Sequence, residues 1–101
     1  MLIEITNYYA RQGNAEAVLA QRRRATAIRE QLGLAPGRTF VKLEGAGPDV
    51  RWECEFRSRA DFERDMTARA ASSEFAAARQ AMHALVERFE RHLQQEVNPR
   101  D

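Results

Sequence analysis

The stretch Val50-Arg51-Trp52-Glu53-Cys54-Glu55-Phe56-Arg57 decides the fold, because apolar and charged side chains alternate along its whole length. Successive side chains of a β-strand point to opposite faces of the sheet. One face of this strand therefore carries a continuous apolar row, and the other carries only glutamate and arginine. The pattern predicts a strand whose apolar face is covered by a hydrophobic core.

Two stretches upstream, residues 2–9 and 38–44, also have the composition and alternation of strands. In the first, Ile3 and Ile5 alternate with polar residues, so we expect both isoleucines to face the core. In the second, Thr39, Val41 and Leu43 share one face. The opposite sheet face is then expected to carry Glu4, Thr6, Tyr8, Phe40, Lys42, Arg51, Glu53 and Glu55.

Between the first two strands, residues 15–32 have apolar side chains at helical spacing. Asn14 before them is a good N-cap, and Gly33 after them suits the left-handed turn that ends many helices. Within this helix, Arg22 belongs to a run of three arginines that we assign to the solvated side.

A second helical segment is expected to begin near residue 59, because Ser58 and Asp61 have the spacing of a helix cap. The pair Ser72-Ser73 interrupts it as a bend or as a fresh cap. Apolar residues then recur at spacings of three and four as far as Phe89, which predicts a helix through that residue. Residues 91–97 either continue the helix or form a last strand.

Composition excludes several classes of protein. The chain has 101 residues, 44% of them hydrophobic and 31% charged, which is typical of one soluble domain spanning residues 1–101. A net charge of +1 argues against nucleic acid as a partner. No apolar run approaches the roughly 20 residues of a membrane span, and no signal peptide is evident, so we expect no membrane partner. Because Cys54 is the only cysteine, no internal disulfide forms, and we expect a cytoplasmic protein.

The predicted order β-α-β-β-α, with a possible last strand, is that of the ferredoxin-like split βαβ unit, an α+β fold with an antiparallel sheet. In this arrangement the strands at residues 2–9 and 50–57 pair at the centre, and both helices cover one face. The other face is left without a layer of its own. A domain this small buries only about 60–70% of the surface of its unfolded chain, and a partner would extend its core, so we expect this face to pair with a second copy in a homodimer.

The chain resembles the dimeric α/β-barrel superfamily, which includes NIPSNAP-like and antibiotic-biosynthesis-monooxygenase-like domains; the NIPSNAP-like proteins are nearest. The resemblance is carried by residues 2–5, the loop 32–38, the strand 49–56 and the helix pattern from Ser73 to Phe89. It implies that two sheets pack face to face into a closed barrel. The activities that it implies are diverse and include cofactor-independent oxygenation and isomerisation, so fold kinship alone supplies no reaction.

Three residues are candidates for the chemistry of a pocket. Trp52 could stack on a flat apolar ligand, although a tryptophan on an apolar face is more often part of the core. His83 could act as a general base, and Tyr8 could hydrogen-bond a substrate oxygen. The more common roles are a boundary histidine and a framework aromatic.

Further residues are expected to bind a ligand or to pair with one another. Arg38 could clamp an anionic group, and Met82 and Phe56 lie on the apolar sides of their elements. Glu4, Glu53 and Glu55 could perform acid–base chemistry if they share a face, although salt-bridged positions are more common. No metal-ligand spacing and no nucleotide-binding motif occurs, so we expect neither metal nor cofactor.

The leading hypothesis is therefore a homodimeric α/β-barrel protein with a small apolar pocket, acting as a cofactor-independent oxygenase or isomerase of small organic molecules. The alternative is a non-catalytic module for ligand binding or dimer assembly. An RNA-recognition surface ranks last, because the aromatic residues of the strand 50–57 face the helices.

Overall fold

The computed structural model describes residues 1–100. The elements follow in the order β1 (Leu2–Ala10), a 3-10 turn (Arg11–Gly13), α1 (Ala15–Gln31), β2 (Arg38–Val41), β3 (Val50–Phe56), α2 (Arg59–Ala70), α3 (Ser73–Leu85) and β4 (Val86–Gln95). The four strands form one antiparallel sheet in the order β2-β3-β1-β4. The predicted central pairing of the first and third strands is confirmed.

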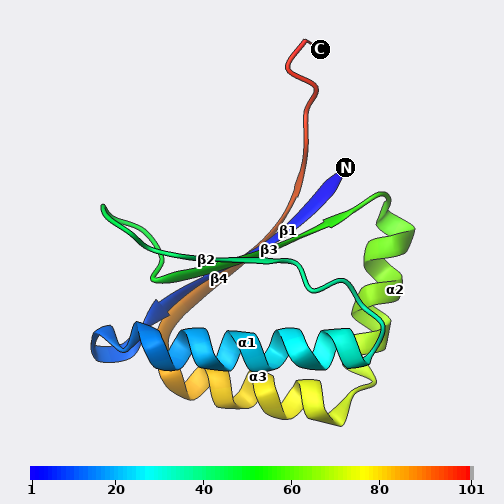
Figure 1. The fold of residues 1–101 in the computed structure, drawn as a ribbon. Helices are drawn as coiled ribbons and strands as arrows, with labels where there is room; N and C mark the ends of the chain where they lie inside the picture. Colours follow the sequence, from blue (N-terminus) through cyan, green and yellow to red (C-terminus); the bar gives the residue numbers. More distant parts are fainter. Residues whose placement is uncertain (101) are drawn as a thin grey trace.

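The helices form a layer on one face of this sheet (Figure 1). Helices α1 and α3 lie side by side across the face, and α2 stands at one end of the layer. No helix among residues 1–100 covers the opposite face. The predicted α+β, ferredoxin-like fold is confirmed. None of the helices in this range is both long enough and apolar enough to cross a bilayer.

Local sequence signals fix the helix ends. The Asn14 side chain accepts a hydrogen bond from the backbone N–H of Ala17 at 3.2 Å, so it caps α1 as predicted. The Ser72 hydroxyl accepts one from the backbone N–H of Phe75 at 3.1 Å. Of the two readings of Ser72-Ser73, the fresh cap is therefore the one that the structure adopts.

The end of α1 is a Schellman turn built on Gly33, whose φ is +77°. The backbone N–H of Gly33 donates to the Glu30 carbonyl at 3.0 Å, and that of Leu34 donates to the Arg29 carbonyl at 2.9 Å. This turn brings the chain back past the helix, where Arg29 Nε donates to the Ala35 carbonyl at 2.7 Å. The turn thus helps to place the loop that leads into β2.

The prediction for the two faces of β1 was wrong. Glu4 pairs with Cys54 across the sheet and Thr6 pairs with Trp52, so both point toward the helices. Ile3 and Ile5 point to the opposite face. The physical reason is that Arg69 of α2, which is buried, and Arg91 of β4 neutralise Glu4. These partners cannot be recognised in the sequence of the strand itself.

The prediction that the last helix continues through Phe89 was also wrong. Helix α3 ends at Leu85 and passes directly into β4, which pairs with β1 from Val86 to Gln95. Phe89, Arg91 and Leu93 alternate along the strand and face the helices. Residues 86–95 form backbone hydrogen bonds with β1, and these decide the conformation of the segment. The helical spacing of Phe89 is a coincidence, because helix propensity is readily overridden by such tertiary pairing. Strand β2 is shorter than expected and ends at Val41.

Candidate functional site

A pocket of about 300 Å³ lies between the sheet and the helix layer. Its floor comes from β1, β3 and β4, and its walls come mainly from α1 and α3. The residues that line it are Glu4, Thr6, Tyr8, Gln21, Arg22, Ala25, Trp52, Arg69, Phe75, Ala78, Arg79, Met82, His83, Phe89 and Arg91. The lining therefore combines an aromatic and aliphatic surface with several guanidinium groups and a single carboxylate.

Trp52 is held in one position beneath the helices. Its side chain is buried, and its indole N–H donates to the Pro36 carbonyl at 2.9 Å. The guanidinium carbons of Arg22 and Arg29 lie 4.5 Å and 4.9 Å from the centre of the ring system. The loop approaches closely because residue 37 is a glycine: a Cβ there would lie 2.5 Å from the indole nitrogen.

Arg22 is a buried cation without an acidic partner. Its exposure is 4%, and no salt bridge of the described residues includes it. Nη1 donates to the Tyr8 hydroxyl at 3.2 Å and Nε donates to the Thr26 hydroxyl at 3.4 Å. Nη2 has no hydrogen-bond partner within residues 1–100. Burial lowers the pKa of this guanidinium, the neighbouring Tyr8 opposes the shift, and the group stays charged.

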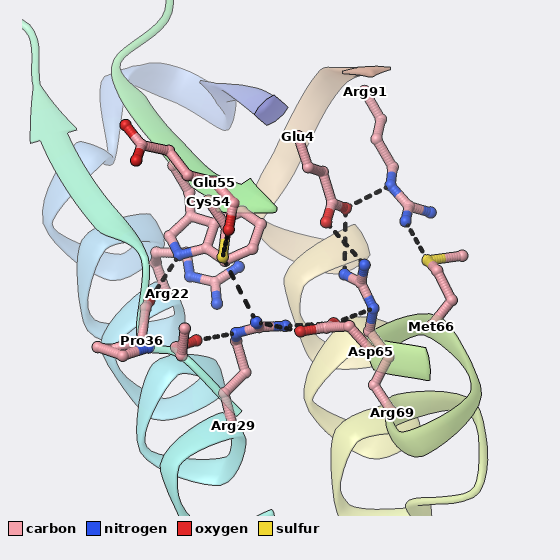
Figure 2. A network of polar contacts seen from close by, with 12 residues as sticks. Glu4, Arg22, Arg29, Pro36, Cys54, Glu55, Asp65, Met66, Arg69 and Arg91 are labelled. Atoms are coloured by element: carbon pink, nitrogen blue, oxygen red, sulfur yellow. Dashed lines mark hydrogen bonds and ion pairs between the residues drawn. The ribbon is translucent and has the colours of Figure 1, made fainter. Parts of the chain in front are cut away.

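The other arginines of this region are paired with carboxylates. Figure 2 shows the Glu4 carboxylate between Arg69 and Arg91, with Arg69 nitrogens at 2.7 and 3.1 Å and Arg91 Nε at 2.8 Å. Asp65 accepts two hydrogen bonds from Arg29, at 2.7 and 3.0 Å, and lies 3.3 Å from Arg69 Nε. The two carboxylates are thus fully used in holding α1, α2, β1 and β4 together.

The charges beneath Trp52 do not balance among the described residues. Arg29, Arg69 and Arg91 share the two carboxylates of Glu4 and Asp65, and the guanidinium group of Arg22 pairs with neither. Glu4 already accepts three hydrogen bonds, so it is a poor general base in this arrangement. The site can accordingly bind an anion more readily than a cation.

Four of the residues predicted for the site lie together around this pocket: Trp52, Tyr8, Met82 and His83. His83 is exposed and stacks on Phe89 with ring centres 5.2 Å apart, which places it at the rim. It is the one histidine among the residues that line the pocket.

Two other predicted residues lie elsewhere. Arg38 is on the open sheet face, where it contacts Glu53 at 2.5 Å and Glu55 at 3.5 Å. Phe56 is buried against Phe62, with ring centres 5.4 Å apart, and does not line the pocket. Glu4 is separated from Glu53 and Glu55 by the sheet, so the three glutamates do not form one site.

Sequence reasoning missed Arg22, which was assigned to the solvated side of its helix. The signal was present, because Val18, Arg22, Ala25 and Arg29 follow one another at spacings of four, three and four. This spacing places both arginines on the buried stripe. Arg23 and Arg24 are exposed, as expected.

Metal-binding geometry does not occur within the described part of the chain, where no cluster of three or more His, Cys, Asp or Glu residues could hold an ion. Cys54 is free and buried, and burial raises the pKa of its thiol.

The fold and the pocket between sheet and helices define a ferredoxin-like α+β protein. No protein-family model matches the chain, and no curated protein matches it. Its fold is that of NIPSNAP domain proteins and antibiotic biosynthesis monooxygenase-like proteins, so the predicted resemblance is confirmed at the level of the fold.

Three solved structures illustrate the likeness. An uncharacterised NIPSNAP domain protein from Burkholderia xenovorans has a TM-score of 0.77 at 16% identity, with 96% of this chain and 95% of that chain covered. A structure described as an antibiotic biosynthesis monooxygenase has a TM-score of 0.71 at 20% identity, with 97% and 100% covered. A dimeric protein of unknown function with a ferredoxin-like fold, from Bacteroides fragilis, has a TM-score of 0.70 at 14% identity, with 94% and 95% covered.

Proposed function

We propose that the chain is a small-molecule-binding protein whose pocket takes a compact, largely apolar organic molecule. The observation that carries this proposal is the pocket itself, about 300 Å³ between sheet and helices. Its volume is at the lower end of the range of ligand sites, roughly 300–1,000 Å³. Trp52, Phe75, Met82 and Phe89 supply an apolar lining that suits a flat ligand.

A pocket-filling substitution tests this proposal. Thr6 lies on the floor of the pocket, so the larger side chain of Thr6→Leu is expected to occupy ligand space and to weaken binding at least about tenfold. Neutral probes such as phenylacetamide and benzyl alcohol can be titrated while the fluorescence of Trp52, the only tryptophan, is recorded.

Thr39→Leu is the matched control. Thr6 on β1 and Thr39 on β2 both pair with Trp52, which lies on the strand between them. Thr39, however, is exposed and lies outside the pocket. It should bind the probes as the wild type does. Equal affinities for the two variants, or no binding of any probe to the wild type, would contradict the proposal.

A catalytic role is the finer form of this proposal, and His83 supports it. An imidazole at the rim could remove a proton from a bound carbon acid and leave the electron pair on the ligand. In an isomerisation the proton returns at another carbon, so no co-reactant is required; a cofactor-independent oxygenation requires dioxygen as the oxidant. The name of one structural neighbour, an antibiotic biosynthesis monooxygenase, agrees with the second reaction.

The non-catalytic alternative is supported by the Glu4 carboxylate, which is occupied by two arginines and leaves the pocket without a free carboxylate base. Product analysis separates the two roles. A bound probe with an acidic C–H that exchanges deuterium or is converted in air favours the enzyme, and unchanged recovery favours the binding module.

We infer also that two copies associate through the open sheet face to form a barrel. By register this face carries Ile3, Ile5, Asn7, Tyr9, Arg38, Phe40, Arg51, Glu53, Glu55, Arg88, Glu90 and His92. The face carries both arginines and glutamates, so groups of opposite charge on two copies could pair across a two-fold axis. The Arg51 hydrogen bond, above all, lowers the pKa of Glu53, which remains charged at neutral pH. The apolar side chain of Phe40 is exposed on this face. The buried Oδ1 atom of Asn7 has no hydrogen-bond partner among residues 1–100.

The homodimer is tested by sedimentation. Wild-type protein is expected to sediment at about twice the chain mass of 11.6 kDa, and Phe40→Glu is expected to shift it toward the monomer, because a buried apolar contact becomes an unpaired charge. Leu32→Glu, on an exposed residue at the end of α1, should leave the mass unchanged. A monomeric wild type at micromolar concentration would exclude an obligate dimer.

The remaining parts of the proposal concern organisation and location. We infer that residues 1–101 act as one domain in the cytoplasm. The single thiol, on Cys54, is buried and free, which suits a reducing compartment.

A further inference from the structure

We infer that the ligand of this pocket is a carboxylic acid, held as its carboxylate by Arg22 and the Tyr8 hydroxyl. The inference deepens the proposed function, because it depends on the pocket binding a small molecule and names the chemical class of that molecule. It is carried by Arg22, a buried lining residue that has no acidic partner in the described chain.

An uncompensated buried charge is costly for a folded protein. Arginine cannot relieve that cost by losing its proton, because its pKa remains far above neutral pH. Stacking on Trp52 and hydrogen bonds to two hydroxyl groups compensate part of the charge. Neighbouring Arg29 adds a second positive charge against the same ring, and its partner Asp65 is shared with Arg69. An anion entering the pocket would supply the missing charge.

The hydrogen bonds identify the kind of anion. Tyr8 accepts a hydrogen bond from Arg22 and, among the described residues, donates its own proton to none. Arg22 Nη2 is likewise unused within residues 1–100. The Tyr8 hydroxyl and Arg22 Nη2 are therefore two unused donors on neighbouring side chains. A carboxylate has two oxygens, so it can accept a hydrogen bond from each of them.

The rest of the lining describes the remainder of the ligand. Phe75, Ala78, Met82 and Phe89 present apolar surface, and the volume of about 300 Å³ limits the molecule to a small acid. Glu4 does not repel the anion strongly, because Arg69 and Arg91 neutralise it. The expected ligand is therefore a small, mainly apolar monocarboxylate with an aromatic or branched body.

The test compares phenylacetate with phenylacetamide, which has nearly the same shape but no charge. Trp52 fluorescence reports binding of both to the wild type. The acid is expected to bind about tenfold to a hundredfold more tightly than the amide, as is usual for hydrogen bonds to a charged group. Arg22→Met should lose this preference while it retains its affinity for the amide.

Arg23→Met is the matched control, because it removes an exposed arginine one position away and should preserve the preference for the acid. Circular dichroism establishes that each variant is folded. If Arg22→Met does not fold, the comparison of acid and amide on the wild type still decides the question. A second variant, Arg22→Lys, keeps the positive charge but lacks the planar set of guanidinium donors. It should bind the acid more weakly than the wild type does.

The outcomes separate this inference from the proposed function. Equal affinities of the wild type for acid and amide would overturn the carboxylate and leave the pocket as a binding site for neutral molecules. Binding of neither compound would overturn both. If inorganic phosphate quenches Trp52 fluorescence as strongly as phenylacetate does, the site binds free anions in general. That result would also overturn the inference that the ligand is a carboxylic acid.

Discussion

Glu4→Gln is expected to lower the free energy of unfolding by about 3–5 kcal/mol, the usual effect of removing one partner of a buried ion pair. The Glu4 side chain is 1% exposed and pairs with both Arg69 and Arg91. The glutamine amide can accept from one of these arginines, but it carries no charge, so Arg91 loses its carboxylate partner and Arg69 keeps only Asp65. Urea unfolding followed by circular dichroism measures the change.

Glu55→Gln is the control for this substitution. Its side chain is 51% exposed, and its contact with Arg38 is 3.5 Å long, so the expected change is about 0–1 kcal/mol. If the two variants lower the free energy of unfolding equally, the buried ion pairs of Glu4 contribute no more to stability than the exposed contact of Glu55. The explanation given for the inward-facing Glu4 would then be wrong.

Gly37→Ala is expected to lower the free energy of unfolding by about 2–5 kcal/mol, from a strained backbone and an overpacked contact together. The φ of Gly37 is +71°, and a Cβ there would lie 2.5 Å from the Trp52 indole nitrogen and 2.6 Å from the Glu53 carbonyl oxygen. The loop must move away, which breaks the hydrogen bond from the indole to Pro36. A red shift of the Trp52 emission should therefore accompany the lower urea midpoint.

Gly33→Ala separates the two contributions. Gly33 has a similar φ of +77°, but a Cβ there would meet no atom within 4 Å. Only the backbone strain remains, so a loss of about 1–2 kcal/mol and an unchanged tryptophan emission are expected. If Gly37→Ala costs no more than Gly33→Ala, the tight packing of the loop against Trp52 is not required.

The layout of the fold could be predicted because its signals are local. The alternation around Trp52, the cap at Asn14 and the glycine at position 33 each act within a few residues, and each is found in the structure where the sequence places it. Their order along the chain then leaves few topologies to consider. The class of fold follows from these elements alone.

The orientation of β1 and the start of β4 could not be predicted because they depend on distant partners. Glu4 faces inward only because Arg69 and Arg91, 65 and 87 positions later, lie against it. Residues from Val86 onward form a strand because the edge of β1 is free to pair with them. Hydrophobic patterning reports neither event, since it treats every charged residue as solvated.

The candidate site was predicted in part for the same reason. Trp52, Tyr8, Met82 and His83 were selected as aromatic, apolar or titratable residues, and they lie around one pocket. Arg38 was selected for its charge beside a strand, but the pleat directs it to the other face. The run of three arginines predicts a solvated Arg22, but its helical spacing from Val18 and Ala25 places it on the buried side.

The direct passage of α3 into β4 has a consequence for how a molecule reaches the pocket. His83 and Phe89 stack at the rim, and they belong to two rigid elements that meet without a loop at Leu85 and Val86. There is no flexible segment between them that could swing aside as a lid. Entry of a ligand into the pocket is therefore expected to depend on rotation of the His83 and Phe89 rings about their side-chain bonds. Such rotation is faster by orders of magnitude than the opening of a lid.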